Sequence, residues 1–167
     1  QMTGDDWGPA ETRLLAEFRN LRDHNVLHPL RRGYRRGEGE ALRRDLEIMQ
    51  QAGLQTRPIF GPVNAMVYTA ERATPEYLAE FRATTDEAFT LIEEVLGHHD
   101  LFARGWDEPG RKTVIGQRPL WEYIHQKGGR IYSTGKPWHL TWAGHAEDFT
   151  NMGGWTDRDQ VSRWHQT

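Results

Sequence analysis

The stretch "GKPWHLTWAGHAEDF", residues 135–149, gathers side chains that could carry out chemistry. It contains two imidazoles and two nearby carboxylates, those of His139, His145, Glu147 and Asp148. An imidazole titrates near neutral pH, and a neighbouring carboxylate can orient it for proton transfer. We therefore predict that these four residues are catalytic, with His139 as the principal acid–base group.

Aromatic residues favour a binding pocket in the same half of the chain. Six of the seven Trp and six of the eight His follow residue 97. Pockets for small molecules combine aromatic walls with a few placed polar groups. We predict one concave apolar wall containing three indoles, and a substrate-binding set made of Trp121, Trp138, Trp142, Tyr123 and Lys136.

A metal centre is the first alternative, because His and carboxylate side chains together can hold zinc or non-haem iron. The residues that would serve are His98, His99, His139 and His145. Their spacing matches no HExxH or H-x-H pattern, and an imidazole just after a helix also complements the helix dipole. The preferred interpretation therefore has no cofactor.

The segment Arg31–Arg44, "RRGYRRGEGEALRR", supports a second alternative, an RNA-binding or RNA-cleaving domain. Its arginines and Tyr34 could contact phosphates and bases. Acidic neighbours nearly cancel this charge, however, and the whole chain carries a formal net charge of −3. Nucleic-acid binding is therefore disfavoured relative to a small-molecule ligand.

Apolar periodicity and end signals predict the elements that must position these residues. Helices are expected over 9–24, 38–52 and 74–97, with "TTDE" at 84–87 as a second helix start. Strands are expected over 63–68, 112–116, 129–134 and 137–143, a short helix from Pro119 and a last helix from Thr156. The predicted class is α+β, with N-terminal helices followed by a small mixed, mainly antiparallel sheet and short helices.

The 167 residues are expected to form one domain, 1–167, with residues 1–8 flexible. The chain has no Cys and no apolar run of the roughly 20 residues that a bilayer requires, so we expect a cytoplasmic protein without membrane contact. The predicted function is a small-molecule enzyme with His-centred acid–base chemistry, acting on an aromatic or polycyclic metabolite. A small-ligand binding protein without catalysis is a further alternative, and the oligomeric state stays open.

Overall fold

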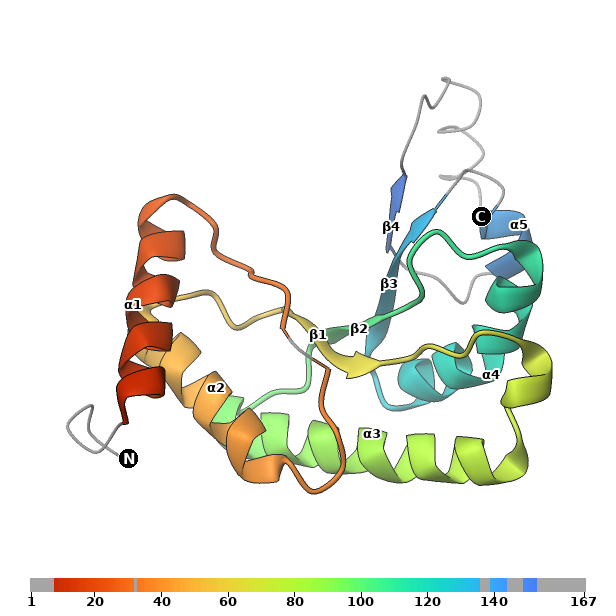
Figure 1. Ribbon diagram of the computed structural model, residues 1–167, viewed down its shortest axis with the longest axis horizontal. Coiled ribbons are helices and arrows are strands. Elements are labelled where there is room, and N and C mark those ends of the chain that lie inside the picture. Colours follow the sequence, from red (N-terminus) through yellow and green to blue (C-terminus); the bar gives the residue numbers. More distant parts are fainter. Residues whose placement is uncertain (1–7, 32, 136–138, 144–148, 153–167) are drawn as a thin grey trace.

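The computed structural model describes residues 8–31, 33–135, 139–143 and 149–152. These residues form helices and one four-stranded sheet (Figure 1). The helical elements are α1 (Pro9–Asp23), α2 (Gly39–Ala52), the 3₁₀ turn η2 (Ala70–Arg72), α3 (Pro75–Leu96), α4 (Arg111–Gln126) and α5 (His139–Ala143). The strands are β1 (Ile59–Asn64), β2 (Leu101–Arg104), β3 (Arg130–Gly135) and β4 (Phe149–Met152). This combination of N-terminal helices with a small sheet confirms the predicted α+β class.

The first three helices match their predictions because apolar spacing and end signals agree in them. Gly53 ends α2 in the left-handed conformation, with φ at 75°, which glycine adopts without steric penalty. Thr74 begins α3, and its side chain accepts a hydrogen bond from the Tyr77 N–H at 3.2 Å. The expected second start at 84–87 is wrong, since α3 is continuous and Thr85 is buried within it.

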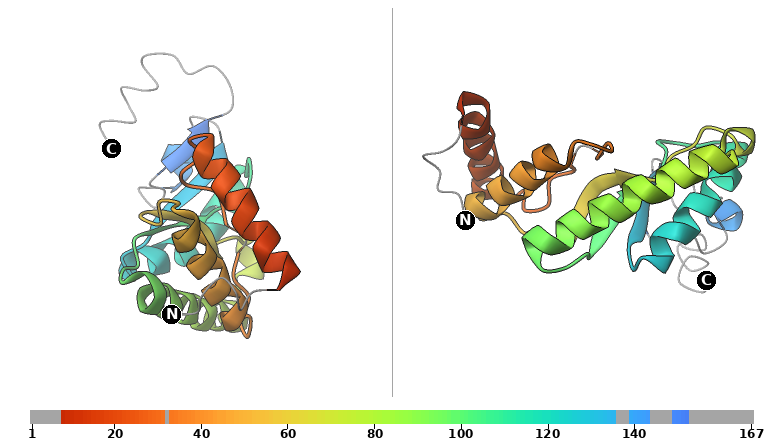
Figure 2. Two further views of the ribbon diagram at one scale, coloured as in Figure 1. Left: turned by 90° about the vertical axis from the view of Figure 1, so that its left-hand side faces the viewer. Right: turned by 90° about the horizontal axis from the view of Figure 1, so that it is seen from below.

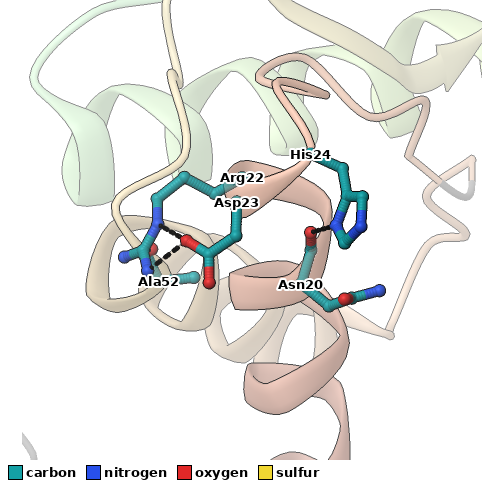
Figure 3. A network of polar contacts seen from close by, with 5 residues as sticks. All are labelled: Asn20, Arg22, Asp23, His24 and Ala52. Carbon is teal, nitrogen blue, oxygen red and sulfur yellow. Dashed lines mark hydrogen bonds and ion pairs between the residues drawn. The ribbon is translucent and has the colours of Figure 1, made fainter.

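A polar network joins the end of α1 to the end of α2 (Figure 3). The Arg22 guanidinium donates to the carbonyl oxygen of Ala52 at 2.7 Å and to the Asp23 carboxylate at 2.7 and 2.9 Å. His24 Nδ1 lies 2.8 Å from the carbonyl oxygen of Asn20, which accepts its hydrogen bond. Arg22 thus satisfies a carbonyl at the end of α2, where backbone acceptors have no partner within the helix.

The sheet is parallel, which corrects the expectation of a mainly antiparallel one. β1 pairs with β2, β2 with β3 and β3 with β4, so the order in space follows the order in the chain. α3 connects β1 to β2, and α4 connects β2 to β3. Such helical crossovers return each strand in the direction of the one before it. The prediction was wrong because it divided residues 112–143 into short strands and turns in place of a crossover helix.

Two further strand predictions fail for the same reason. Residues 112–116 and the expected short helix from Pro119 both belong to α4, which buries Val114, Leu120 and Ile124 at helical spacing. Pro119 lies on the exposed side of this helix. The strand predicted over 137–143 is replaced at its described residues by the helix α5.

The remaining strands differ less from their predictions. β3 confirms the strand expected over 129–134, whereas β1 begins and ends earlier than the predicted 63–68. The strand includes Gly61 and Pro62, which were interpreted as its entry turn. Tertiary pairing extends β1 back to Ile59, because Ile59 and Phe60 lie in register with the start of β2. The helix predicted from Thr156 lies outside the described residues.

Helices cover one face of the sheet. α3 runs beneath the strands in Figure 1 and crosses in front of them in the view from below (Figure 2). Burial alternates along β3, where Ile131 and Ser133 are buried and Tyr132 and Thr134 are partly exposed. One hydrophobic cluster contains residues from α1 to α4 and from the first three strands. Of the helices that the structure describes, none is both long and apolar enough to cross a lipid bilayer.

Candidate functional site

The parallel order brings the carboxyl ends of the strands to one edge of the sheet. β1, β2 and β3 end at Asn64, Arg104 and Gly135, respectively. The loops that follow these residues therefore emerge side by side, and in open parallel sheets ligands bind outside this edge. This edge is the first place to look for placed polar groups.

A carboxylate from the loop after β2 is held there by the neighbouring strand. The Thr134 hydroxyl of β3 donates a hydrogen bond to Asp107 Oδ1 and accepts one from the Glu108 N–H at 2.9 Å. The Glu108 N–H also reaches the carbonyl oxygen of Thr134 at 3.2 Å. Asp107 remains exposed, so the carboxylate is both oriented and accessible to solvent.

The backbone of Glu108 supports a functional interpretation of this loop. Its φ is 44°, a left-handed conformation that residues other than glycine seldom adopt. Such conformations are unfavourable by about 1–3 kcal/mol and concentrate at functional sites. The two hydrogen bonds from the Glu108 N–H to Thr134 hold the residue in this conformation.

Two aromatic residues come from the loops at the same edge, since Trp106 directly precedes Asp107 and Tyr68 lies in the loop after β1. The Trp106 ring packs edge to face against Tyr68, with centroids 5.4 Å apart. Tyr68 is 52 % exposed, and the Arg72 guanidinium lies 5.8 Å from its ring centroid. The backbone N–H of Trp106 donates to Oε1 of the buried Gln117 at 2.9 Å, which attaches this loop to α4. Tyr68, Trp106, Asp107, Glu108 and Thr134 are called the carboxyl-edge cluster below.

The carboxyl-edge cluster has the components of a small-molecule site. The aromatic rings of Trp106 and Tyr68 offer apolar surface, and the exposed carboxylate of Asp107, in the same loop as Trp106, is a group of the kind that transfers protons in enzymes. Sequence reasoning missed this cluster because it did not assign β2 as a strand. The available signal was "LFARGWDEPG", an apolar run followed directly by Trp106, Asp107 and Glu108.

His139 lies on the other side of the same strand end. It begins α5, is 2 % exposed and has its ring 5.7 Å from that of Trp142. A Cβ built on Gly135 would overlap the imidazole, so the ring occupies the position where a side chain of β3 would project. Side chains alternate between the two faces of a strand, so His139 and the Thr134 hydroxyl lie on opposite faces. His139 and Asp107 are therefore near one strand end without sharing a surface.

Replacing Gly135 by Ala is expected to destabilise the protein by about 1–3 kcal/mol, because the added methyl group displaces a buried ring. Urea unfolding measures the change. Adding His139→Ala to this variant should recover part of the loss, since it removes the ring with which the methyl collides. Strictly additive effects of the two substitutions would contradict the described contact between Gly135 and His139.

The predicted tryptophan wall is only partly described. Trp121 is fully buried, and its Nε1–H donates to the carbonyl oxygen of Ala65 at 3.0 Å. Trp142 is partly buried against the same hydrophobic cluster. The position of Trp121 favours a packing role over direct contact with a ligand. Trp138, the third indole of the predicted wall, lies outside the described residues, as do Lys136, His145, Glu147 and Asp148.

Tyr123 contacts α3 from the last turns of α4, which leads away from the carboxyl edge. Its hydroxyl donates to Asp86 Oδ1 at 2.7 Å, and Lys127 Nζ lies 2.9 Å from the same oxygen. Burial and the neighbouring Asp86 raise the pKa of Tyr123 to about 12. Burial alone would raise the pKa of Asp86, but the hydrogen bonds from Lys127 and Tyr123 lower it below its ordinary value.

This arrangement predicts an acid-sensitive contribution to stability. Because the pKa of Asp86 is lowered in the folded state, its contribution is present above the ordinary aspartate pKa of about 3.9 and is lost as pH falls through the lower folded value. Asp86→Asn should therefore flatten the decline in unfolding free energy between about pH 5 and pH 2. Tyr123→Phe should flatten it less, since Lys127 remains. The unfolding free energy is measured with urea at several pH values in this range. If it declines as steeply with falling pH in Asp86→Asn as in the wild type, the assignment is refuted.

The three proposed metal ligands that the structure describes, His98, His99 and His139, do not come together at one site. His98 and His99 precede β2, whereas His139 follows β3, so they lie at opposite edges of a parallel sheet. Burial, and then the charge of Arg57, lower the pKa of His98, whose Nδ1 accepts from the Asp100 N–H at 3.1 Å. In the described part of the chain, no group of three or more His, Cys, Asp or Glu side chains is placed to hold a metal ion.

Arginines of the segment Arg31–Arg44 are engaged with acidic side chains. Arg31 forms an ion pair with Asp45 and lies 4.7 Å over the Phe18 ring. Arg36, Arg43 and Arg44 form ion pairs with Glu80, Glu94 and Glu11, respectively, at 3.1, 2.5 and 3.4 Å. These pairings support the expectation that the positive charge of this segment is largely compensated within the protein.

Comparisons with protein-family models, characterised proteins and solved structures found no match to this chain.

Proposed function

We propose that the protein is an enzyme that binds a small molecule at the carboxyl-edge cluster and acts on it by acid–base chemistry. The observation that carries the proposal is the Asp107 carboxylate, oriented by Thr134 from the neighbouring strand and exposed beside Trp106. A proton-transfer group must be both positioned and accessible to its substrate. Among the described candidates, Asp107 meets these two requirements and the buried His139 meets the first.

The proposal gives each residue of the cluster a role. Trp106 and Tyr68 form an apolar wall against which a planar or ring-shaped ligand would pack. Asp107 is the proton-transfer group, and Thr134 is a positioning residue that acts through it. The aromatic wall suits the aromatic or polycyclic metabolite expected from the sequence. The absence of Cys in the sequence agrees with the proposed cytoplasmic location.

His139 as the principal acid–base group stays a prediction. It requires that substrate reach the covered side of β3, where His139 and Trp142 lie together. In that hypothesis Glu147 or Asp148 orients His139 or His145. The two hypotheses differ in the residue whose loss abolishes turnover, so one set of variants distinguishes them.

A thermal-shift screen tests the proposed binding site. The probes are aromatic and polycyclic metabolites and, as a second class of ring, monosaccharides. A ligand present at about 100 times its Kd should stabilise the protein by about 2.7 kcal/mol, seen as a rise in Tm. Trp106→Ala should weaken that ligand about tenfold or more, because the lost aromatic contact is worth about 1.4 kcal/mol.

Ile115→Ala is the control, since it truncates an exposed apolar side chain on α4 that is not part of the cluster. It should leave the ligand-induced rise in Tm unchanged. Binding that persists in Trp106→Ala with full affinity would locate the ligand elsewhere. If binding requires Trp106 but no turnover is found, the protein is a small-ligand binding protein and the enzyme proposal is wrong.

A further inference from the structure

A small cavity lies between the start of the arginine-rich segment, the end of β1 and the middle of α3. Its volume is about 30 Å³, and Tyr34, Val63, Asn64, Phe81, Thr85 and Ala88 are among its lining residues. Three of the lining residues, Val63, Phe81 and Ala88, are apolar, and the other four, including Thr84, carry hydroxyl or amide groups. This cavity is separate from the carboxyl-edge cluster, with which it shares no residue.

Three residues that line this cavity carry a buried oxygen with no hydrogen-bond partner of normal length and angle in the described part of the chain. These oxygens are Tyr34 Oη, Asn64 Oδ1 and Thr85 Oγ1. Tyr34 is 7 % exposed and Thr85 is fully buried. Buried polar atoms in folded proteins are nearly always paired, with protein groups or with ordered water. Three such atoms around one cavity therefore indicate a shared partner.

We infer that ordered water occupies this cavity and bridges Tyr34, Asn64 and Thr85. The volume exceeds the roughly 10–15 Å³ that one water molecule requires. Two of the three groups are hydroxyls, which can donate, and the third is an amide oxygen, which accepts. One water molecule can accept two hydrogen bonds and donate one, so it satisfies all three groups at once.

The chemistry of the wall favours water over a cation. None of the residues that line the cavity carries a formal charge. Burial, and then the hydrogen-bonding influence and charge of Glu87, raise the pKa of Tyr34 to about 12. Tyr34 therefore keeps its proton at neutral pH, and its hydroxyl can donate to the water or, where its proton is turned toward Glu87, accept from it. A bound ammonium or potassium ion would need several oxygen acceptors, whereas two hydroxyl donors and one acceptor match neutral water.

The bridging water would attach the arginine-rich segment to the sheet. Gly33 and Tyr34 already lie alongside β1, because the Tyr34 N–H donates to the carbonyl oxygen of Pro62 at 2.7 Å. A Cβ on Gly33 would overlap the Asn64 side chain, so the amide is held closely against this segment. Water between Asn64, Tyr34 and Thr85 would link both the arginine-rich segment and β1 to α3. This link would hold the carboxyl end of β1 in place.

Thr85→Val provides the test, because it replaces the hydroxyl by a methyl group of similar size. If water bridges the three groups, the variant loses a hydrogen bond and leaves the water with fewer partners, and Tm should fall by about 2–6 °C. Tyr34→Phe should lower Tm similarly. The double variant should lose less than the sum, since both residues share one partner. Thr90→Val, on the exposed side of α3, is the matched control and should leave Tm nearly unchanged.

A cavity without water predicts that these substitutions do not lower Tm. Removing an unpaired buried hydroxyl is neutral or stabilising, so Thr85→Val and Tyr34→Phe would then keep or raise Tm additively, and the inference would be overturned. It would also be overturned by a rise in Tm specific to ammonium or potassium over sodium that disappears in Thr85→Val. Independently of any variant, a high-resolution crystal structure should show a water within about 2.7–3.2 Å of all three oxygens.

Discussion

Replacing Asp107 by Asn is expected to lower turnover by about 10²- to 10⁴-fold, the usual loss when a proton-transfer group is removed. The amide keeps the shape of the carboxylate and can still accept the hydrogen bond from Thr134. The free energy of unfolding should therefore change little. Steady-state kinetics with the small molecule found by thermal shift, together with urea unfolding, measure the two quantities.

Asp23→Asn is the matched control, because Asp23 is an exposed aspartate whose recorded hydrogen bonds are with Arg22 at the end of α1. It should retain wild-type turnover. His139→Ala completes the set. If it abolishes turnover while Asp107→Asn retains it, the sequence-based hypothesis is correct and the carboxyl-edge proposal is wrong. Thr134→Val should lower kcat with little effect on KM, because Thr134 positions Asp107 and the Glu108 backbone and has no assigned contact with the substrate.

Trp121→Ala is expected to destabilise the fold by about 3–5 kcal/mol, which is the usual range for removing a buried aromatic side chain. Trp121 is fully buried, and its loss also leaves the carbonyl of Ala65 without the indole donor. Stabilities of domains are about 5–15 kcal/mol, so this variant approaches unfolding. Urea or thermal unfolding provides the measurement.

Trp121→Phe separates the two contributions of the indole. It keeps most of the apolar ring and removes the Nε1–H, so a smaller loss of about 1–3 kcal/mol is expected. A Trp121→Ala variant with nearly wild-type stability would contradict the core position. That result would instead support the prediction from the sequence that Trp121 contacts the ligand.

The N-terminal helices could be predicted from the sequence because their signals are local. Pro9, Thr74 and the glycines at 53 and 97 mark ends that the structure retains. Side-chain spacing within each helix is also a local property, and it agrees with the buried face of α2. These elements needed no knowledge of what they pack against.

The sheet could not be predicted in the same way, because strand direction depends on pairing between distant residues. β2 is only four residues long, and its place between β1 and β3 is set by pairing with residues 40 to 42 positions earlier and 28 positions later. Residues 112–116 resemble a short strand until the buried positions 120, 121 and 124 extend the helical face. The local pattern therefore supported two interpretations, and packing decided between them.

The candidate site depends on the same nonlocal information. Asp107 and Thr134 are 27 positions apart, and only parallel pairing of β2 with β3 brings them into hydrogen-bond contact. The sequence directed attention to His139 because imidazoles, carboxylates and indoles are close together along the chain there. The local pattern predicted His139 within a strand over 137–143, whereas it begins the helix α5, and the pattern could not indicate that the ring is buried against Gly135.

Indole N–H signals in a proton–nitrogen NMR spectrum test the location of the binding site most directly. The Trp106 signal is assigned by its loss in Trp106→Phe, and those of Trp121 and Trp142 by the corresponding variants. On addition of the ligand from the thermal-shift screen, the Trp106 signal should move with saturation while that of the buried Trp121 stays in place. A Trp106 signal that stays in place at saturation while that of Trp142 moves would put the ligand beside His139 and contradict the carboxyl-edge site.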